Sequence, residues 1–331
     1  MADLFLGVDV GFGETKAVLI SKPTIRRQVS IPTAITPLAV EMISGLNSRE
    51  THYEFNGKKY LAGTDAVFSG TSLPTRNVHF LIDNSAIMIA AILDKIPELN
   101  DVKTSNLCVC AGLPLEFYAD YKQALKESIS DFSINGKKFK FKSVSIMAQG
   151  EGVLYDYAID ENFKLRSSVD GSNMVVIDVG YNTVDVLIVN QGSCSSHHSQ
   201  MLESAGICKA TKMLESHVKS QIKSIVGMSA ILTEQDLKQC LKQKFFVFKG
   251  ERIEFADICA EIIREYSAYL YAEIENRFGP FIVRADRVLC AGGGAHYISN
   301  YFTEKLGEKF LFIPEKPEFA NARGYGKFCS A

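Results

Sequence analysis

The segment "GVDVGFGETKAVLI", residues 7–20, places two apolar runs on either side of a short stretch that is rich in glycine. The runs at 4–10 and 16–20 predict two buried strands joined by a turn. Asp9 stands at the end of the first strand, and Gly11 and Gly13 allow the backbone N–H groups of the turn to approach an anion. Alone, the segment is equally compatible with an ordinary hairpin.

Two familiar phosphate-binding loops do not match these residues. The dinucleotide-binding fingerprint needs G-x-G-x-x-G at the start of a helix, whereas here Lys16 leads into a strand. A P-loop needs four residues between its glycines and a Gly-Lys-Ser or Gly-Lys-Thr ending, which are also absent from residues 11–16. The turn therefore belongs to another class of site.

The opening segment recurs half a chain later as "VIDVGYNTVDVLIV", residues 176–189. Both copies read strand, Asp-Val-Gly-aromatic, small polar residues and a second apolar strand. Asp9 aligns with Asp178, and a one-residue deletion aligns Thr15 with Thr183. This offset is far too long for a solenoid, so it predicts a duplicated protein whose two lobes face each other across a cleft.

Two aspartates that face the same bound phosphates would repel them. A divalent cation between them removes this conflict, and Mg²⁺ takes oxygen ligands and keeps several of its waters. Asp9 and Asp178 therefore predict a Mg-nucleotide held between two phosphate-binding turns.

Composition limits the class of protein. With 331 residues, 47% of them hydrophobic, the chain can build a large core, and its net charge of −2 argues against a surface devoted to nucleic acid. The eight cysteines are scattered without a CxxC pair, which favours buried thiols in a reducing compartment. No signal peptide or membrane span is indicated. We expect a cytoplasmic protein with no membrane contact.

The rest of the chain alternates strands with helices, which is typical of an α/β protein. Helices are predicted at 84–96, 118–130, 204–222 and 254–278, Asn-Gly hairpins at 52–63 and 132–148, and a strand, glycine turn and helix at 285–306. Between 138 and 142, lysines alternate with phenylalanines. This predicts a solvated strand face, and a partner-binding face is the alternative.

Together these segments resemble the actin-like ATPase superfamily, and most closely the ParM-type actins that segregate plasmids. Residues 7–16 and 176–186 are similar to its two phosphate motifs, and "VLCAGGGAHYI" (288–298) is similar to its adenosine motif. "MAQGEGVLYDYA" (147–158) and "NARGYG" (321–326) stand where the family places two helices that connect the lobes. "CAGLPLEFY" (110–118) resembles a segment of the ParM branch.

The resemblance implies a duplicated actin-like, ribonuclease H-like α/β fold with two lobes around a nucleotide cleft. The first lobe would span 1–155, with 319–331 returning to it and a smaller subdomain inserted at about 30–105. The second lobe would span 156–318, with a smaller subdomain at about 208–284.

The resemblance also implies site residues. Asp9 and Asp178 would hold Mg²⁺ through water, and Gln149 would orient the attacking water, with Glu151 as the alternative. Tyr181-Asn182-Thr183 departs from the glycine-rich second motif of many members, although Asn tolerates left-handed backbone angles. Nucleotide contacts are expected from Gly11, Phe12, Gly13, Thr15, Lys16, Gly180, Tyr181, Asn182, Thr183, Gly206, Gly292, Gly293 and Gly294.

The implied function is that of an ATPase that binds Mg-ATP, with GTP as the alternative nucleotide, and polymerises head to tail into dynamic filaments. A ParM-type role would add a small DNA-binding adaptor protein and plasmid segregation, with no direct sequence-specific contact between the filament and DNA. A soluble ATP-dependent kinase or phosphatase of the same fold is the alternative.

Overall fold

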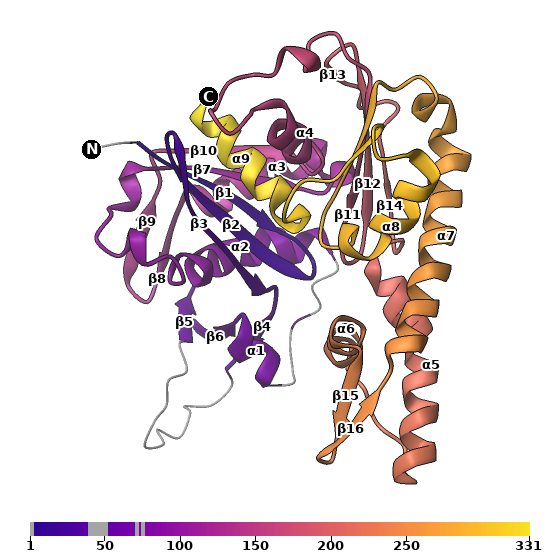
Figure 1. Ribbon diagram of the computed structural model, residues 1–331. Coiled ribbons are helices and arrows are strands. Elements are labelled where there is room, and N and C mark those ends of the chain that lie inside the picture. Colours follow the sequence, from indigo (N-terminus) through magenta and orange to yellow (C-terminus); the bar gives the residue numbers. More distant parts are fainter. Residues whose placement is uncertain (1–2, 39–51, 70–72, 74–76) are drawn as a thin grey trace.

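Two mixed sheets organise the part of the chain that the computed structural model describes, residues 3–38, 52–69, 73 and 77–331 (Figure 1). The first sheet has the order β10-β7-β1-β2-β3, and the second has the order β13-β12-β11-β17-β18, with β14 also paired to β12. We call the elements built around them the first and the second lobe. The strands of the first sheet are β1 (Leu4–Val10), β2 (Glu14–Ser21), β3 (Thr24–Pro32), β7 (Leu107–Leu113) and β10 (Ser143–Ala148). Those of the second are β11 (Met174–Val179), β12 (Val184–Asn190), β13 (Ser193–Cys194), β14 (Gln200–Leu202), β17 (Arg287–Ala291) and β18 (Leu311–Phe312).

The second sheet repeats the pairing of the first. β1 is antiparallel to β2 and parallel to β7, which is parallel to β10. In the same way, β11 is antiparallel to β12 and parallel to β17, which is parallel to β18. The predicted duplicated α/β fold is therefore confirmed.

The two hairpin turns have the same length. Val10 pairs with Thr15, and Val179 pairs with Val184, so each turn holds four residues, 11–14 and 180–183. Gly11 N–H donates to the Glu14 carbonyl at 3.2 Å and Gly180 N–H to the Thr183 carbonyl at 2.9 Å. The deletion inferred from the sequence was wrong, because matching threonines guided that alignment whereas the hydrogen bond across each turn fixes the register.

Long helices cover one face of each sheet. α2 (Val78–Leu93) and α3 (Leu115–Ser130) lie on the first sheet, and α2 is buried almost all round, as its apolar sequence predicts. Asn77 caps α2 by accepting a hydrogen bond of 2.7 Å from Phe80 N–H. α5 (Ile207–Val226), α7 (Ala256–Ile282) and α8 (Ala295–Leu306) cover the second sheet with a core that includes Tyr266 and Phe302.

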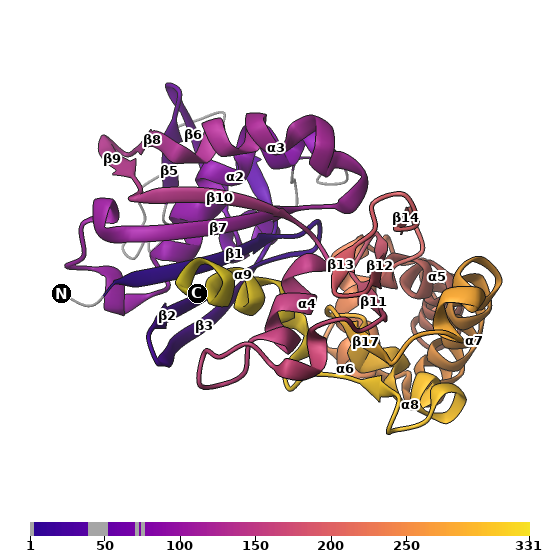
Figure 2. The same cartoon turned by 90° about the horizontal axis from the view of Figure 1, so that it is seen from above.

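Two connecting helices are exchanged between the lobes (Figure 2). α4 (Glu151–Ala158) follows β10 of the first sheet, yet its Leu154 belongs to a core with Val176 and Leu289 of the second. α9 (Ala320–Ser330) follows the second sheet, yet its Ala322 packs on Val18 of the first. Each lobe therefore depends on the other for the cover of its inner face.

The two connecting helices touch at glycines. A Cβ atom on Gly324 of α9 would lie 1.7 Å from the Gly152 carbonyl oxygen of α4, so the backbones themselves are in contact. Next to this crossing, buried Asp156 of α4 accepts a hydrogen bond of 2.7 Å from Arg323 Nε and pairs with Lys327 Nζ at 2.9 Å. The crossing thus combines close packing with a satisfied buried ion cluster.

Smaller elements extend both lobes at the lower end of Figure 1. The first lobe adds β4 (Ile35–Pro37), β5 (His52–Phe55), β6 (Lys58–Ala62) and α1 (Thr64–Phe68), and the second adds α6 (Glu234–Gln243) with the hairpin β15 (Phe245–Phe248) and β16 (Glu251–Glu254). The hairpin β8 (Asp131–Ile134) and β9 (Lys137–Lys140) lies at the edge of the first lobe. In β9 and the two residues after it, Phe139 and Phe141 are buried, whereas Lys138, Lys140 and Lys142 are exposed, as the alternation predicts. Short 3₁₀ helices occupy Pro97–Leu99, Thr104–Asn106, Ser167–Val169 and Pro317–Phe319.

Candidate functional site

A cavity of about 1100 Å³ lies between the two lobes and is faced by both four-residue turns. The second turn is joined to the glycine turn before α8, and the first turn is joined to β3 by Thr33 N–H, which donates to the Gly13 carbonyl at 3.2 Å. Most of the residues predicted from the sequence therefore meet at one place. Those that line the cavity are Asp9, Gly11, Phe12, Gly13, Lys16, Gln149, Asp178, Gly180, Tyr181, Asn182, Thr183, Gly292, Gly293 and Gly294.

Thr15 and Gly206 are not among the lining residues. The Thr15 side chain is fully buried, with its hydroxyl 2.9 Å from that of Thr33. Gly206 lies behind the second turn at the start of α5, where a Cβ atom would come within 2.5 Å of the Tyr181 carbonyl oxygen. The next two N–H groups of α5, from Ile207 and Cys208, donate to carbonyls of that turn. Both residues support the turns from behind rather than face the cavity.

The glycines at 292–294 allow a close approach of two backbones. Gly292 has φ +85°, and a Cβ atom there would lie 2.4 Å from Asp178 Oδ1. Gly294 N–H donates to the Val179 carbonyl at 2.8 Å. The turn that opens α8 is thus packed directly against the end of β11, and only glycine fits at 292.

Three buried carboxylates lie at this end of the strands. Burial raises the pKa of Asp9, while Lys16 and a hydrogen bond from Gln149 oppose that rise. Burial and the charge of Asp9 raise the pKa of Asp178 to about 6, against a hydrogen bond from Asn321. Burial and the charge of Asp178 raise the pKa of Asp185 to about 8. The three acids are therefore costly to ionise together unless a cation joins them.

These donors fit a hydrated divalent cation. Among the described residues, no three His, Cys, Asp or Glu side chains converge on a direct metal site. Asp9, Asp178 and Asp185 nevertheless act on one another electrostatically and all line the same cavity. Mg²⁺ keeps several waters, so carboxylates that line one cavity without converging would hold it through them.

Asp185 was missed by the sequence reasoning. In the register of the strands, Asp178 pairs with Asp185 as Asp9 pairs with Lys16, so Asp185 takes in the second hairpin the place of the lysine in the first. An alignment of the two copies without a gap places Asp185 opposite Lys16 and would have marked it as a candidate site residue. Its Oδ1 also accepts a hydrogen bond of 3.0 Å from Leu115 N–H at the start of α3. This contact links the second sheet to the Leu-Pro-Leu segment of the first lobe.

Gln149 and Glu151 have different surroundings. The Gln149 side chain is buried, lines the cavity and donates from Nε2 to Asp9 Oδ1 at 2.9 Å. Glu151 Oε2 instead accepts a hydrogen bond of 3.0 Å from Ala148 N–H at the end of β10, and Glu151 does not line the cavity. This geometry favours Gln149 as the group that reaches a bound molecule.

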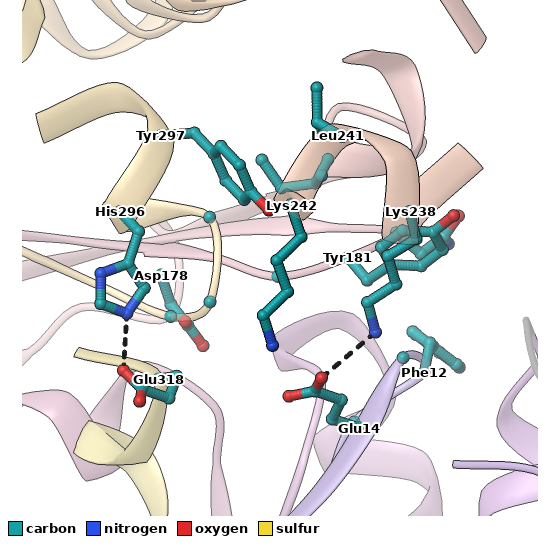
Figure 3. Close-up of a pocket in the computed structure, with 18 of the residues that line it drawn as sticks. Phe12, Glu14, Asp178, Tyr181, Lys238, Leu241, Lys242, His296, Tyr297 and Glu318 are labelled. Atoms are coloured by element: carbon teal, nitrogen blue, oxygen red, sulfur yellow. Dashed lines mark hydrogen bonds and ion pairs between the residues drawn. The ribbon is translucent and has the colours of Figure 1, made fainter. Parts of the chain in front are cut away.

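The other half of the cavity is formed by helices of the second lobe. The first turns of α7 contribute Ile263 and Arg264 to the cavity lining, and α8 contributes Tyr297 and Asn300. His296 lies at its edge, with Nε2 2.8 Å from Glu318 Oε2 (Figure 3). Aromatic, aliphatic and polar groups together suit a flat polar ring.

Helix α6 contacts both turns (Figure 3). Lys238 Nζ lies 3.4 Å from Glu14 Oε1 of the first turn. The Tyr181 hydroxyl of the second turn donates to Glu234 Oε1 at 2.7 Å, and Lys238 Nζ lies 5.3 Å from the centre of the Tyr181 ring. Sequence reasoning did not find these α6 residues.

Comparison with known families decides the assignment. The model of the N-terminal domain of actin-like proteins matches residues 7–152, and the model of the C-terminal part of an archaeal, MreB-like actin homologue matches residues 176–304. The chain belongs to the actin-like proteins. This actin-like protein thus carries both halves of the fold in the expected order, which confirms the family resemblance.

Relatives and solved structures agree with that assignment. The actin-like protein is 22% identical to archaeal actin homologs of Thermoplasma volcanium and Thermoplasma acidophilum, over 97% of each chain. Its fold is similar to the crystal structure of an archaeal actin homolog, with a TM-score of 0.77, 20% identity, and coverage of 100% of this chain and 99% of that one. The subunit of a 15-stranded ParM filament from Clostridium botulinum gives a TM-score of 0.75 at 21% identity, covering 100% and 99%. An archaeal actin homolog in complex with ADP gives 0.74 at 21% identity, covering 97% of each chain.

The described helices contain none that is long and apolar enough to cross a membrane.

Proposed function

We propose that this actin-like protein binds Mg-ATP between its lobes, hydrolyses it, and polymerises into dynamic filaments. One observation carries the proposal: two turns of equal length, each after a buried aspartate at a strand end, face one cavity. Backbone N–H groups of Gly13 and Asn182 would hold the phosphates from opposite sides, while those of Gly11 and Gly180 close the two turns. The solved ADP complex of a similar protein supports a nucleotide at this place.

For the proposed hydrolysis, the main task of the site is to position the metal, the phosphates and the attacking water. Bound Mg²⁺ would neutralise charge on the phosphates, and Asp9 and Asp178 would hold its waters. In-line attack on the γ-phosphate needs an oriented water more than covalent catalysis. The neutral amide of Gln149 can hold that water without repelling phosphate, and its bond to Asp9 fixes its orientation.

We further propose that the base lies between α7 and α8. ATP is favoured by the family resemblance, and GTP is the alternative. Competition between the two nucleotides for the same site, measured by calorimetry, decides the preference.

We propose polymerisation because a related protein assembles into filaments. The filament of a similar ParM supports self-association, and a head-to-tail contact between unlike surfaces gives an open helix rather than a closed ring. We propose lobes with the limits given above, a small DNA-binding adaptor as a second partner, and plasmid segregation as the process served.

The experiment is assembly in the presence of Mg-ATP. Right-angle light scattering and high-speed pelleting should show polymer after nucleotide is added, and loss of polymer as phosphate is released. Asp178→Asn is the variant for the site: it should weaken Mg-dependent nucleotide binding by at least about tenfold. A wild-type protein that stays monomeric with every nucleotide at high concentration would refute the filament proposal.

A further inference from the structure

The first turn and α6 are joined by an ion pair across the cavity. Lys238 Nζ lies 3.4 Å from Glu14 Oε1, and Glu14 Oε2 also accepts a hydrogen bond of 3.3 Å from Ser30 Oγ. The side chains are 21% and 35% exposed, so the pair is partly shielded from water. It links a phosphate-binding turn of the first lobe with a helix of the second.

The charges around this carboxylate do not balance. Burial raises the pKa of Glu14, yet Lys238, Lys16 and Lys242 reverse this effect and hold the pKa below its ordinary value. Burial, together with Lys16 and Lys242, lowers the pKa of Lys238 in spite of Glu14. Figure 3 shows Lys242 extending toward the same carboxylate. Lys238 and Lys242 thus share the Glu14 carboxylate with Lys16, which also acts on Asp9 and Asp178. The two ammonium groups of α6 suit a polyphosphate.

The ion pair lies where the two turns meet. A Cβ atom on Gly13 would come within 2.7 Å of Tyr181 Cβ, so the first turn is pressed against the second. Tyr181 in turn is bonded to α6 through Glu234. A nucleotide whose phosphates lie between the turns would therefore come directly beside Glu14 and Lys238, which both line the cavity.

We propose that Glu14 competes with the nucleotide phosphates for Lys238 and Lys242, and so acts as a built-in counter-ion of the phosphate site. Without a nucleotide, Glu14 holds α6 across the cleft. When phosphates enter, the two lysines turn to them and fix α6 over the bound nucleotide. This inference rests on nucleotide binding as proposed above, and it makes Lys238 and Lys242 phosphate-binding residues and Glu14 a residue that sets affinity.

Competition of Glu14 for the lysines and simple repulsion of phosphate by Glu14 predict different binding results. If Glu14 acts by occupying the lysines, removal of its charge strengthens nucleotide binding only while the lysines are present. If it merely repels phosphate through space, the gain persists after the lysines are gone. A double-mutant cycle separates the two cases.

The experiment is titration calorimetry of the full chain with Mg-ADP at constant ionic strength. Glu14→Gln should bind about fivefold more tightly, and Lys238→Met should bind about tenfold more weakly. Lys238→Arg should recover most of the lost affinity, because it keeps the charge. In a Lys238→Met, Lys242→Met background, Glu14→Gln should change affinity by less than about twofold.

Matched controls are Glu261→Gln on α7 and Lys219→Met on α5, both exposed and outside the cavity lining, which should leave affinity unchanged. The inference is overturned if Glu14→Gln increases Mg-ADP affinity equally in the background that lacks both lysines. It is also overturned if Glu14→Gln alone binds Mg-ADP no more tightly than wild type. The proposed function fails separately, if wild-type protein binds neither Mg-ADP nor Mg-ATP.

Discussion

Asp185 shows how a duplicated hairpin can carry two different chemistries. At equivalent positions of the two hairpins stand Lys16 and Asp185. In the proposed site, one copy would offer a cation for phosphate, and the other would offer a third carboxylate beside Asp9 and Asp178 for a metal. Divergence of the repeat at one position makes the site asymmetric, as an asymmetric ligand requires.

The raised pKa values give a pH dependence with a defined sign. In the metal-free protein, burial raises the pKa of Asp178 to about 6 and that of Asp185 to about 8. The folded state prefers the protonated acids, so their contribution to stability is complete below about pH 4 and is lost as the pH rises through these values. Each group loses about 1.4 kcal/mol per pH unit below its folded-state pKa, so between about pH 5 and 9 the free energy of unfolding should fall by on the order of 5 kcal/mol.

Urea denaturation followed by circular dichroism measures this change. Asp185→Asn should abolish the part of the loss above about pH 7. Added Mg²⁺ should oppose the loss, because it binds the ionised carboxylates. Equal slopes for wild type and Asp185→Asn would contradict this prediction.

Substitution of Gln149 should affect ATP hydrolysis, whereas substitution of Glu151 should affect the stability of the fold. Gln149→Ala removes a group that faces the cavity, so we expect ATP hydrolysis to slow by about 10- to 100-fold with Mg-ADP affinity nearly unchanged. Glu151→Ala removes a hydrogen bond from the Ala148 N–H at the end of β10, so it should cost about 1 kcal/mol of stability and leave hydrolysis intact. Phosphate release under single-turnover conditions, with melting temperature as the second readout, tests both. The opposite pattern would assign the water to Glu151.

At the scale of single residues, the sequence could predict groups next to a recognisable turn, such as Asp9 and Asp178. It could not predict Lys238, because the charged side chains of an amphipathic helix look alike whether they face solvent or a cavity. Its contact with Glu14 spans 224 positions along the chain. Asp185 could have been found, but the threonines at 15 and 183 led the alignment into a gap.

At the scale of elements, the contact of α4 with α9 should tolerate no side chain at Gly324. A Cβ atom there would lie 1.7 Å from the Gly152 carbonyl oxygen, so the helices would have to separate. We expect Gly324→Ala to destabilise the protein by about 2 kcal/mol or more. Thermal or urea denaturation gives the measurement.

Gly279→Ala in α7 is the matched control. Nothing lies within 4 Å of a Cβ atom at Gly279, which is also helical. The control should change stability by less than about 1 kcal/mol, because no neighbouring element is displaced and the following Pro280 offsets the helix preference of alanine. If both variants lose the same stability, helix propensity rather than close packing governs Gly324.

At the scale of the whole molecule, the sequence predicted the duplication, the α/β class and the positions of the connecting helices. It could not predict which sheet each connecting helix covers. α4 and α9 both carry small and apolar residues that suit either inner face, and only the three-dimensional structure shows that Leu154 meets the second sheet and Ala322 the first. The exchange is a property of packing that local sequence does not encode.

Cutting the chain between the lobes should therefore leave two incomplete folds. Residues 1–160 lack α9 and the 3₁₀ helix before it, whose Ala322 and Phe319 pack on Val18 and Ile20. Residues 161–331 lack α4. Each fragment alone should show no cooperative unfolding, because an apolar sheet face stays exposed. Co-expressed, they should form a stable one-to-one complex. A fragment that melts cooperatively by itself would count against this dependence.

The exchanged helices also impose an order in time. Residues 4–148 supply every strand of the first sheet, yet the cover of one face arrives only when residues 320–330 have been made. During synthesis on the ribosome, this face of the first sheet would stay uncovered until the whole second lobe has been made. Completion of the last helix, rather than of either sheet, would be the event that closes the core of the first lobe and joins both halves into one cooperative unit.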